Sequence, residues 1–291
     1  MSGLADLRQR RARLQDISGI VTAMKSLSLV ESRKLARRVE HQQRVRRHIA
    51  QVAADFLRAH PAFAAPARGR GTVLVVIGSE RGFCGRFNDR IVQALQGLQG
   101  EAADATWLLV GRRLGQRLPD GARIRARLEG ATVGEDVPAV VDRVLDALRT
   151  QPSSPDAAPA VLAALGHDEQ GEPVLTRLLP LPPPPPGPVA GTPPRLQLPV
   201  AAFHHGLLEQ HLFASLHGLL YASLAAESHQ RLAHMEQALD RLGQTLHRLT
   251  LRGNAMRQEL IVEEIEVLLS SAMAAAQRGE PMAGSHARAR P

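Results

Sequence analysis

The last part of the chain carries an apolar seam with the spacing of a coiled coil. Between 200 and 277 there is no proline, so nothing forces a break in a long helix. Within this stretch apolar side chains recur at alternating steps of three and four residues, which is the a and d pattern of a heptad repeat. The seam consists of Leu232, Met235, Leu239, Leu242, Leu246, Leu249, Gly253, Met256 and Leu260. A helix of this length cannot bury such a seam alone, so the pattern predicts a helical partner.

A matching seam runs through the first 60 residues. Counted in sevens from Leu7, it keeps its register to Phe56, and Pro61 then ends the helix. Polar residues interrupt it at Ser28 and Glu31 and again at Arg38 and Gln42. Two terminal helices with matching seams, joined by a domain between them, can fold back on each other as an antiparallel coiled coil. The alternative is that each helix packs in a larger helical bundle.

Short apolar runs alternate with helical patterns between the two terminal helices. This alternation predicts an α/β sheet, in which strands 72–77 and 106–110 are buried. Further strands are expected at 124–128, 160–165 and 173–179, and helices at 87–98, 112–118 and 138–149. The expected fold is therefore α/β, with a long antiparallel coiled coil and a central Rossmann-like domain. We assign 1–60 to the first helix, 61–199 to the α/β domain with its proline-rich segment, 200–277 to the second helix, and 278–291 to a disordered tail.

The charge of the chain is concentrated in the first helix. The net charge is +8, and the first 60 residues hold 13 Lys and Arg against five Asp and Glu, which accounts for the whole excess. A basic helix can bind nucleic acid, an anionic membrane or an acidic protein surface, or can simply be solvated. Modules that bind single-stranded nucleic acid usually add stacking aromatic residues, whereas this helix has only Phe56. A basic scaffold or nucleic-acid-binding protein with an α/β insert is thus the alternative function.

Residue types that carry chemistry are sparse. Gly78, Gly82 and Gly85 follow the first strand, but their spacing matches neither the dinucleotide fingerprint nor the P-loop, which favours glycines of a tight turn. Cys84 is the single cysteine, so no internal disulfide can form, and no His or Asn partner marks it as a nucleophile. The histidines of the last helix lack the spacing of a metal site. We predict no catalytic, cofactor-binding or metal-ligating residues.

The longest apolar strand-like run, 73–77, is far too short to span a membrane, and the N-terminus has no apolar signal-peptide core. Any membrane association is therefore expected to go through a partner.

Three sequence blocks carry a resemblance to a known family. Residues 20–25 are similar to an I-T-x-A-M block, residues 79–88 to S-D-R-G-L-C-G-x-x-N, and residues 254–264 to N-x-x-R-Q-x-x-I-T-x-E. Glu227, Arg231 and Met235 match an upstream E-x-x-x-R-x-x-x-M pattern, and residues 178–181 match L-L-P-L. On these blocks the chain resembles the gamma subunit of F-type ATP synthases over most of its length. Gly253 replaces the family's usual Tyr and Val262 its usual Thr, which suggests a divergent branch, such as that of an alternative F-type ATPase.

The resemblance implies a central rotor shaft that couples ion flow, of protons or sodium, to ATP synthesis or hydrolysis. It implies a non-catalytic subunit without a cofactor, held on the cytoplasmic face of the bacterial inner membrane. The implied partners are the alpha and beta subunits, the epsilon subunit and the c-subunit ring, with no nucleic acid. The blocks assign rotor–stator contacts to Met24, Lys25, Arg231, Asn254, Arg257, Gln258 and Glu264, and a turn of the central domain to Gly82, Cys84 and Gly85.

Overall fold

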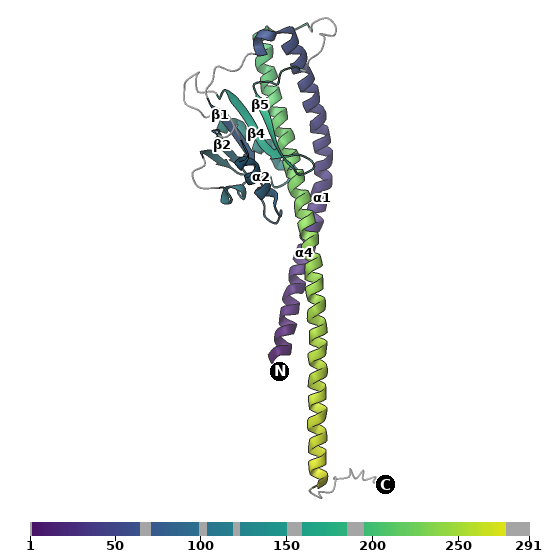
Figure 1. The fold of residues 1–291 in the computed structure, drawn as a ribbon. Helices are drawn as coiled ribbons and strands as arrows, with labels where there is room; N and C mark the ends of the chain where they lie inside the picture. The colour runs from purple at the N-terminus through teal and green to yellow at the C-terminus, as the bar shows by residue number, and fades with distance from the viewer. Residues whose placement is uncertain are drawn as a thin grey trace, which may run out of the picture. The chain divides into compact units, whose positions relative to one another are not determined.

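The computed structural model describes residues 2–64, 71–98, 104–118, 123–149, 159–184 and 195–277 (Figure 1). The chain divides into two compact units, Met1–Thr22 with Ala238–Pro291, and Ala23–Gln237, which we describe separately. Two long helices, α1 (Ser2–Ala59) and α4 (Val200–Gln277), contribute to both units. The expected tail 278–291 and most of the proline-rich segment lie outside the described residues.

Within the larger unit α1 and α4 run antiparallel. The Lys25 ammonium lies 3.0 Å from a carboxylate oxygen of Glu236. Further along, Gln42 donates a hydrogen bond of 3.2 Å to the carbonyl oxygen of Ala214. Near the end of α1 the rings of Phe56 and Phe203 lie 5.3 Å apart between centroids. In these three contacts the residue number increases along α1 while it decreases along α4. This confirms the antiparallel pairing.

The smaller unit shows the heptad seam directly. A Cβ atom placed on Gly3 would lie 3.1 Å from the methyl carbon of Met256, so the N-terminal turn packs beside this seam residue. The seam positions of α4 from Leu239 to Leu260 are half-buried, while most residues between them are exposed. In α1, Ile17 departs from the expected pattern, with 46% of its surface exposed. The seam is therefore a two-helix contact that leaves the rest of each helix at the surface.

A five-stranded sheet lies in the larger unit, with strand order β3-β2-β1-β4-β5. Four strands are parallel, and β5 pairs antiparallel with β4 at one edge. The strands are β1 (Thr72–Ile77), β2 (Thr106–Val110), β3 (Ile124–Leu128), β4 (Val161–His167) and β5 (Pro173–Leu179). The connections between them contain α2 (Phe87–Gln96), α3 (Val137–Arg149) and the 3-10 turns η3 (Leu114–Gln116) and η4 (Gly134–Asp136), and a further 3-10 turn, η1 (Pro61–Ala64), follows α1 before β1. This confirms the Rossmann-like α/β fold.

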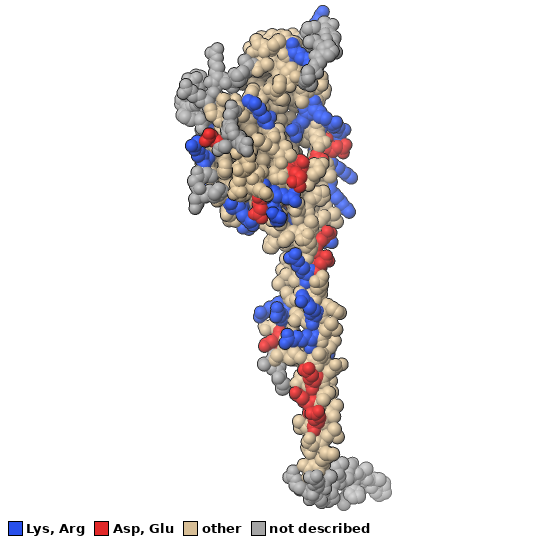
Figure 2. All heavy atoms as spheres, viewed as in Figure 1, with Lys and Arg blue, Asp and Glu red and all other residues tan. Residues whose placement is uncertain are grey.

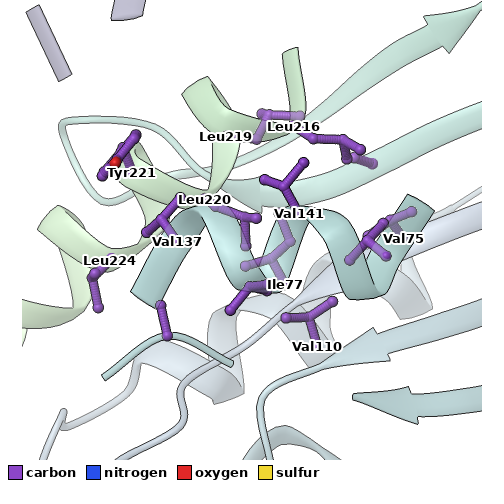
Figure 3. Packing of buried hydrophobic residues seen from close by; sticks show 14 of the residues in the cluster. Val75, Ile77, Val110, Val137, Val141, Leu216, Leu219, Leu220, Tyr221 and Leu224 are labelled. Atoms are coloured by element: carbon purple, nitrogen blue, oxygen red, sulfur yellow. The ribbon is translucent and has the colours of Figure 1, made fainter. Parts of the chain in front are cut away.

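Alternate residues of β1 point to opposite faces of the sheet, as the pleat requires. Leu74 and Val76 pack with Ile91 and Leu95 of α2 on one face. On the other face, residues of β1 and β2 pack against α3 and α4. The side chains labelled in Figure 3 belong to this second cluster, Val75, Ile77, Val110, Val137, Val141, Leu216, Leu219, Leu220, Tyr221 and Leu224.

Helix α4 therefore does more than pair with α1. All residues from 214 to 221 are buried, over more than two turns, so this stretch is covered on every side. A helix that is covered all round belongs to a core. The middle of α4 covers one face of the sheet together with α3, and it also packs against α1.

The polar interruptions in the α1 seam have a structural cause. Arg38 donates to the carbonyl of Gly134 at 3.1 Å and pairs with Glu135 at 2.7 Å, and Glu31 accepts from the Gly134 N–H at 2.8 Å. With the Gln42 bond to α4, these contacts replace apolar packing where α1 meets turn η4. The seam is polar there because those side chains bind backbone groups that need partners.

Candidate functional site

The loop between β1 and α2 lies at a topological switch point. After β1 the chain crosses to β2 on one side, and β4 pairs with β1 on the other. In open α/β sheets, the crevice at the carboxyl ends of the strands at such a point is the usual ligand site. Loop residues 78–86 lie at this crevice, so the side chains around them decide whether it can bind anything.

The backbone of this loop is held in place by a glycine turn and by hydrogen bonds between Ser79 and Asn88. Gly85 has a φ of +57°, a left-handed conformation that costs glycine little. The Ser79 N–H donates to the side-chain oxygen of Asn88 at 3.0 Å, and the Asn88 amide donates to the Ser79 hydroxyl at 2.8 Å. The two ends of the resembling block 79–88 are thus tied together, and the turn expected at Gly82, Cys84 and Gly85 lies between them.

Glu80 joins the ends of three strands. Its buried carboxylate accepts from the N–H of Arg112 at 3.1 Å, after β2, and from the N–H of Gly130 at 2.8 Å, after β3. The Arg112 guanidinium also pairs with it. Burial acts to raise the pKa of Glu80, but these hydrogen bonds and the guanidinium together hold that pKa below its ordinary value. Glu80 therefore holds the carboxyl ends of the three strands together through hydrogen bonds to their backbone. Sequence reasoning missed this role.

A second carboxylate, from α4, fills the loop itself. Glu227 is 3% exposed and accepts hydrogen bonds from the backbone N–H groups of Glu80 and Arg81. Arg231, one turn further along α4, pairs with Glu227 and donates to the Gly82 carbonyl at 3.3 Å. Burial raises the pKa of Glu227 to about 7, against the opposing effects of Arg231 and the two N–H groups. A loop that could cradle an anion thus holds a carboxylate of its own chain.

Cys84 and His167 are buried beside Phe87, next to the loop after β1. Cys84 is buried with Phe87 and Ala226, and burial raises the pKa of its thiol, which disfavours the reactive thiolate. The Phe87 ring stacks on His167 at 3.8 Å between centroids. Burial lowers the pKa of His167 to about 4, so this imidazole is neutral near pH 7. The structure thus favours a buried thiol with a packing role over a nucleophile.

The residues matched to rotor–stator contacts differ in exposure. Arg231 is 7% exposed and is engaged at the loop, so its guanidinium is not available to a partner surface. Met24 is half-buried, and Lys25 pairs with Glu236 of its own chain. The remaining four lie exposed on α4 in the smaller unit, namely Asn254, Arg257, Gln258 and Glu264.

The C-terminal part of α4 has an unusually apolar surface. Every residue from 261 to 273 is exposed. Seven of them are large apolar side chains with exposed fractions of 50–70%, Ile261, Val262, Ile265, Val267, Leu268, Leu269 and Met273. Figure 2 shows acidic side chains grouped on this part of the helix. Exposed apolar surface on this scale is typical of an interaction site.

The described residues hold neither a metal-binding cluster nor a membrane-spanning helix. No group of three or more His, Cys, Asp or Glu in those ranges is placed to hold a metal ion. In the same part of the chain, no helix is both long and apolar enough to cross a membrane.

Comparison with known proteins gives consistent matches along the chain. The ATP synthase family model matches residues 3–275. An ATP synthase gamma chain of Anaeromyxobacter sp. (strain Fw109-5) is 28% identical, with 94% of this chain and 99% of the relative covered. A gamma chain of Pelotomaculum thermopropionicum is 26% identical with the same coverage. Among solved structures, a chain of the Euglena gracilis mitochondrial ATP synthase has a TM-score of 0.64 at 16% identity, covering 98% of this chain and 99% of that one. At that identity the structural match shows the fold alone.

Proposed function

This chain belongs to the ATP synthase family, and we propose that it forms the central rotor shaft of such a complex. The observation that carries the proposal is helix α4. Its middle is part of the core of an α/β domain, and its C-terminal part offers exposed apolar side chains to another protein. A shaft needs both features, because torque has to enter through one part and act on partners through another.

The attachment of the α/β domain to the helices suits the transmission of torque. Within the larger unit, Glu227 and Arg231 clamp the loop after β1, and Glu31 and Arg38 of α1 hold turn η4. The first contact is buried and the second is half-exposed. Hydrogen-bonded contacts of this kind resist shear better than apolar packing alone, since their geometry is directional. The domain is thus fixed to both helices rather than tethered to one.

The proposed partners follow from the surfaces. The apolar stretch 261–273 fits inside a ring of alpha and beta subunits, and Asn254, Arg257, Gln258 and Glu264 contact that ring. Met24 and Lys25 are kept as further contact candidates, whereas Arg231 acts inside the chain. The α/β domain binds the epsilon subunit and the c-subunit ring, which holds the chain peripherally at the cytoplasmic face of a bacterial inner membrane. Catalysis belongs to the ring, and the coupled ion is a proton or sodium.

The alternative of a basic scaffold or nucleic-acid-binding protein is not favoured. Its support was the basic first helix, whereas the ATP synthase family model matches residues 3–275, and that range includes this helix.

Rotation tests the proposal directly. Cys84 is buried, so a cysteine introduced at the exposed Asp142 of α3 provides a specific attachment point. The labelled chain is assembled with cysteine-free alpha, beta, epsilon and c subunits, the ring is immobilised, and the probe is followed under ATP. Stepwise rotation in one direction is expected. A probe that stays fixed while the assembled complex hydrolyses ATP would exclude the shaft role.

A further inference from the structure

A basic cavity of about 470 Å³ lies in the larger unit between α1, β5 and α4. Its polar lining includes Arg46 and Arg47 of α1, Thr176 and Arg177 of β5, and His211 and Ser215 of α4. No Asp or Glu is among the described residues that line it. The volume is in the range that binds small ligands, and the lining has a single sign of charge.

The arginines of this cavity have no carboxylate partner in the described part of the chain. The ion pairs there involve neither Arg46, Arg47 nor Arg177. Asp168 and Glu169 line an adjoining cavity of about 230 Å³, which Arg46 also borders. Glu169 accepts a hydrogen bond from Gln43, and Asp168 accepts from two backbone N–H groups of its own turn. Arg46 is half-buried, whereas Arg47 and Arg177 are exposed. The cavity is therefore lined by three arginines that have no carboxylate partner among the described residues.

Arg46 is placed there by the shape of α4. A Cβ atom on Gly218 would lie 2.4 Å from the Cδ atom of Arg46, so the missing side chain at 218 makes the room that the arginine stem occupies. Burial lowers the pKa of Arg46. A cation that is partly withdrawn from water costs free energy unless an anion approaches it.

His211 provides an independent sign of an absent partner. The residue is 9% exposed, and its Nε2 atom has no hydrogen-bond partner among the described residues. A backbone hydrogen bond with Leu178 fixes the ring. Burial and the nearby Arg46 lower the pKa of His211. Buried polar atoms are normally satisfied by protein, water or ligand.

We propose that this cavity is a binding site for a small phosphate-bearing anion. Guanidinium groups bind tetrahedral oxyanions through paired N–H donors, and the hydroxyls of Thr176 and Ser215 supply further donors beside them. Three cations match the several charges of a phosphate or diphosphate better than the single charge of a carboxylate. A ligand here would connect α1, β5 and α4, and the site goes beyond the shaft role.

The test is calorimetric titration of the full chain with inorganic pyrophosphate at fixed ionic strength. We expect Arg46→Gln and Arg177→Gln each to weaken binding at least about tenfold, because each removes a charge-assisted contact. Arg44→Gln is the matched control, since Arg44 is exposed on α1 outside the cavity and carries the same charge; it should change affinity less than about twofold. Gly218→Ala should weaken binding without any change of charge, because its Cβ displaces Arg46. Tryptophan fluorescence of each variant checks that the domain is folded.

The outcomes separate the sources of the phosphate group. Binding of pyrophosphate that phosphatidylglycerol vesicles do not displace supports a soluble ligand, and displacement by the vesicles supports a lipid headgroup. No binding at millimolar pyrophosphate overturns the proposal, as does an equal loss in Arg44→Gln. Normal affinity in Arg177→Gln and Gly218→Ala, whichever way Arg46→Gln behaves, also overturns it. A cavity that accepts only an acidic segment of a partner protein would likewise overturn it.

Discussion

Two stretches of helix α4 have opposite surroundings. Residues 214–221, in the larger unit, are all buried, whereas residues 261–273, in the smaller unit, are all exposed. Both stretches are rich in Leu and other apolar side chains, so hydrophobicity does not distinguish them. The first stretch packs against the sheet, α3 and α1. Among the described residues of the smaller unit, no other element covers the second stretch. The difference shows that one helix can serve as a core element in one unit and as a docking surface in another.

The polar residues of α4 differ between the two units in the same way. In the larger unit, buried polar groups such as Glu227 and Arg231 are paired with each other and with backbone groups. In the smaller unit, Arg257, Gln258 and Glu264 point into solvent. Substitutions in the first group should therefore change stability, and those in the second should change function in the assembled complex.

The largest effect is expected at the buried ion pair. Arg231→Met leaves Glu227 buried without its cation, which should lower the free energy of unfolding by about 3–5 kcal/mol. Urea unfolding followed by the fluorescence of Trp107, the only tryptophan and a residue of β2, measures this in the α/β domain. Lys25→Met breaks the exposed pair with Glu236, with side chains 36% and 52% exposed, and should cost less than about 1 kcal/mol. Equal effects in the two variants would contradict the distinction.

Core leucines should respond more strongly than seam leucines. Leu216 has no exposed surface, so Leu216→Ala should destabilise the domain by about 2–5 kcal/mol. Leu242 in the smaller unit is only half-buried, and Leu242→Ala should cost about 1–2 kcal/mol. Far-UV circular dichroism during urea unfolding follows both changes, and Trp107 fluorescence follows the first. A larger loss for Leu242→Ala would show that the seam, rather than the sheet, dominates the stability of α4.

The pH dependence of the junction should be small in the intact protein because two groups oppose each other. The pKa of Glu227 is raised from its ordinary value of 4.5 to about 7 in the folded protein. This contributes to the free energy of unfolding at low pH, and the contribution is lost as pH rises from 4.5 to 7. The lowered pKa of His167, about 4 against 6.5, gives a contribution that is lost as pH falls from 6.5 to 4. His167→Leu should remove the second contribution, so that stability falls with rising pH by up to about 1.4 kcal/mol per unit relative to the parent.

Glu227→Gln should tilt the profile the other way. Without the opposing titration of Glu227, stability should fall as pH decreases below 6.5, because His167 and the other histidines with lowered pKa values must then be protonated on unfolding. Urea midpoints measured at half-unit steps between pH 4.5 and 7 test both variants. Parallel profiles in the parent and both variants would show that neither group titrates differently on folding.

The smallest effect on stability is expected at the exposed face of α4, where substitutions should instead change the activity of the assembled complex. Arg257→Ala with Gln258→Ala should change the free energy of unfolding by less than about 0.5 kcal/mol, since both side chains are exposed. In the reconstituted complex it should lower ATP turnover and ion pumping, because Arg257 can form a bidentate link with a partner carboxylate. Arg248→Ala with Gln244→Ala is the matched control on the same helix. Parent rates in both assays would remove Arg257 and Gln258 from the mechanism.

The sequence was informative where structure depends on spacing. The heptad seams, the strands and the tight turn at Gly82–Gly85 were predicted from local patterns, and the structure contains them. The polar positions Glu31 and Arg38 were visible as interruptions, but their partners in turn η4 lie about 100 residues away along the chain. No local pattern could identify those partners.

The site at the loop shows the same limit. Glu227 and Arg231 were found by their match to a family pattern, and the match placed Arg231 at a contact with another subunit. In the structure Arg231 is buried and donates a hydrogen bond to the Gly82 carbonyl. Glu80 drew no attention, although an acidic residue directly after a buried strand is a signal that could have been used. Its role depends on backbone N–H groups after two other strands, and these come together only in the folded sheet.

By itself the sequence determined that two long helices pair through heptad seams and that an α/β domain lies between them. It could do so because the periods of helix and strand are properties of the local backbone. Only the tertiary structure decided that residues 214–221 of α4 belong to the sheet's core, and that a carboxylate from the same helix occupies the loop after β1. Burial and pairing of that kind depend on which distant elements meet, and the spacing of residues along one helix does not specify them.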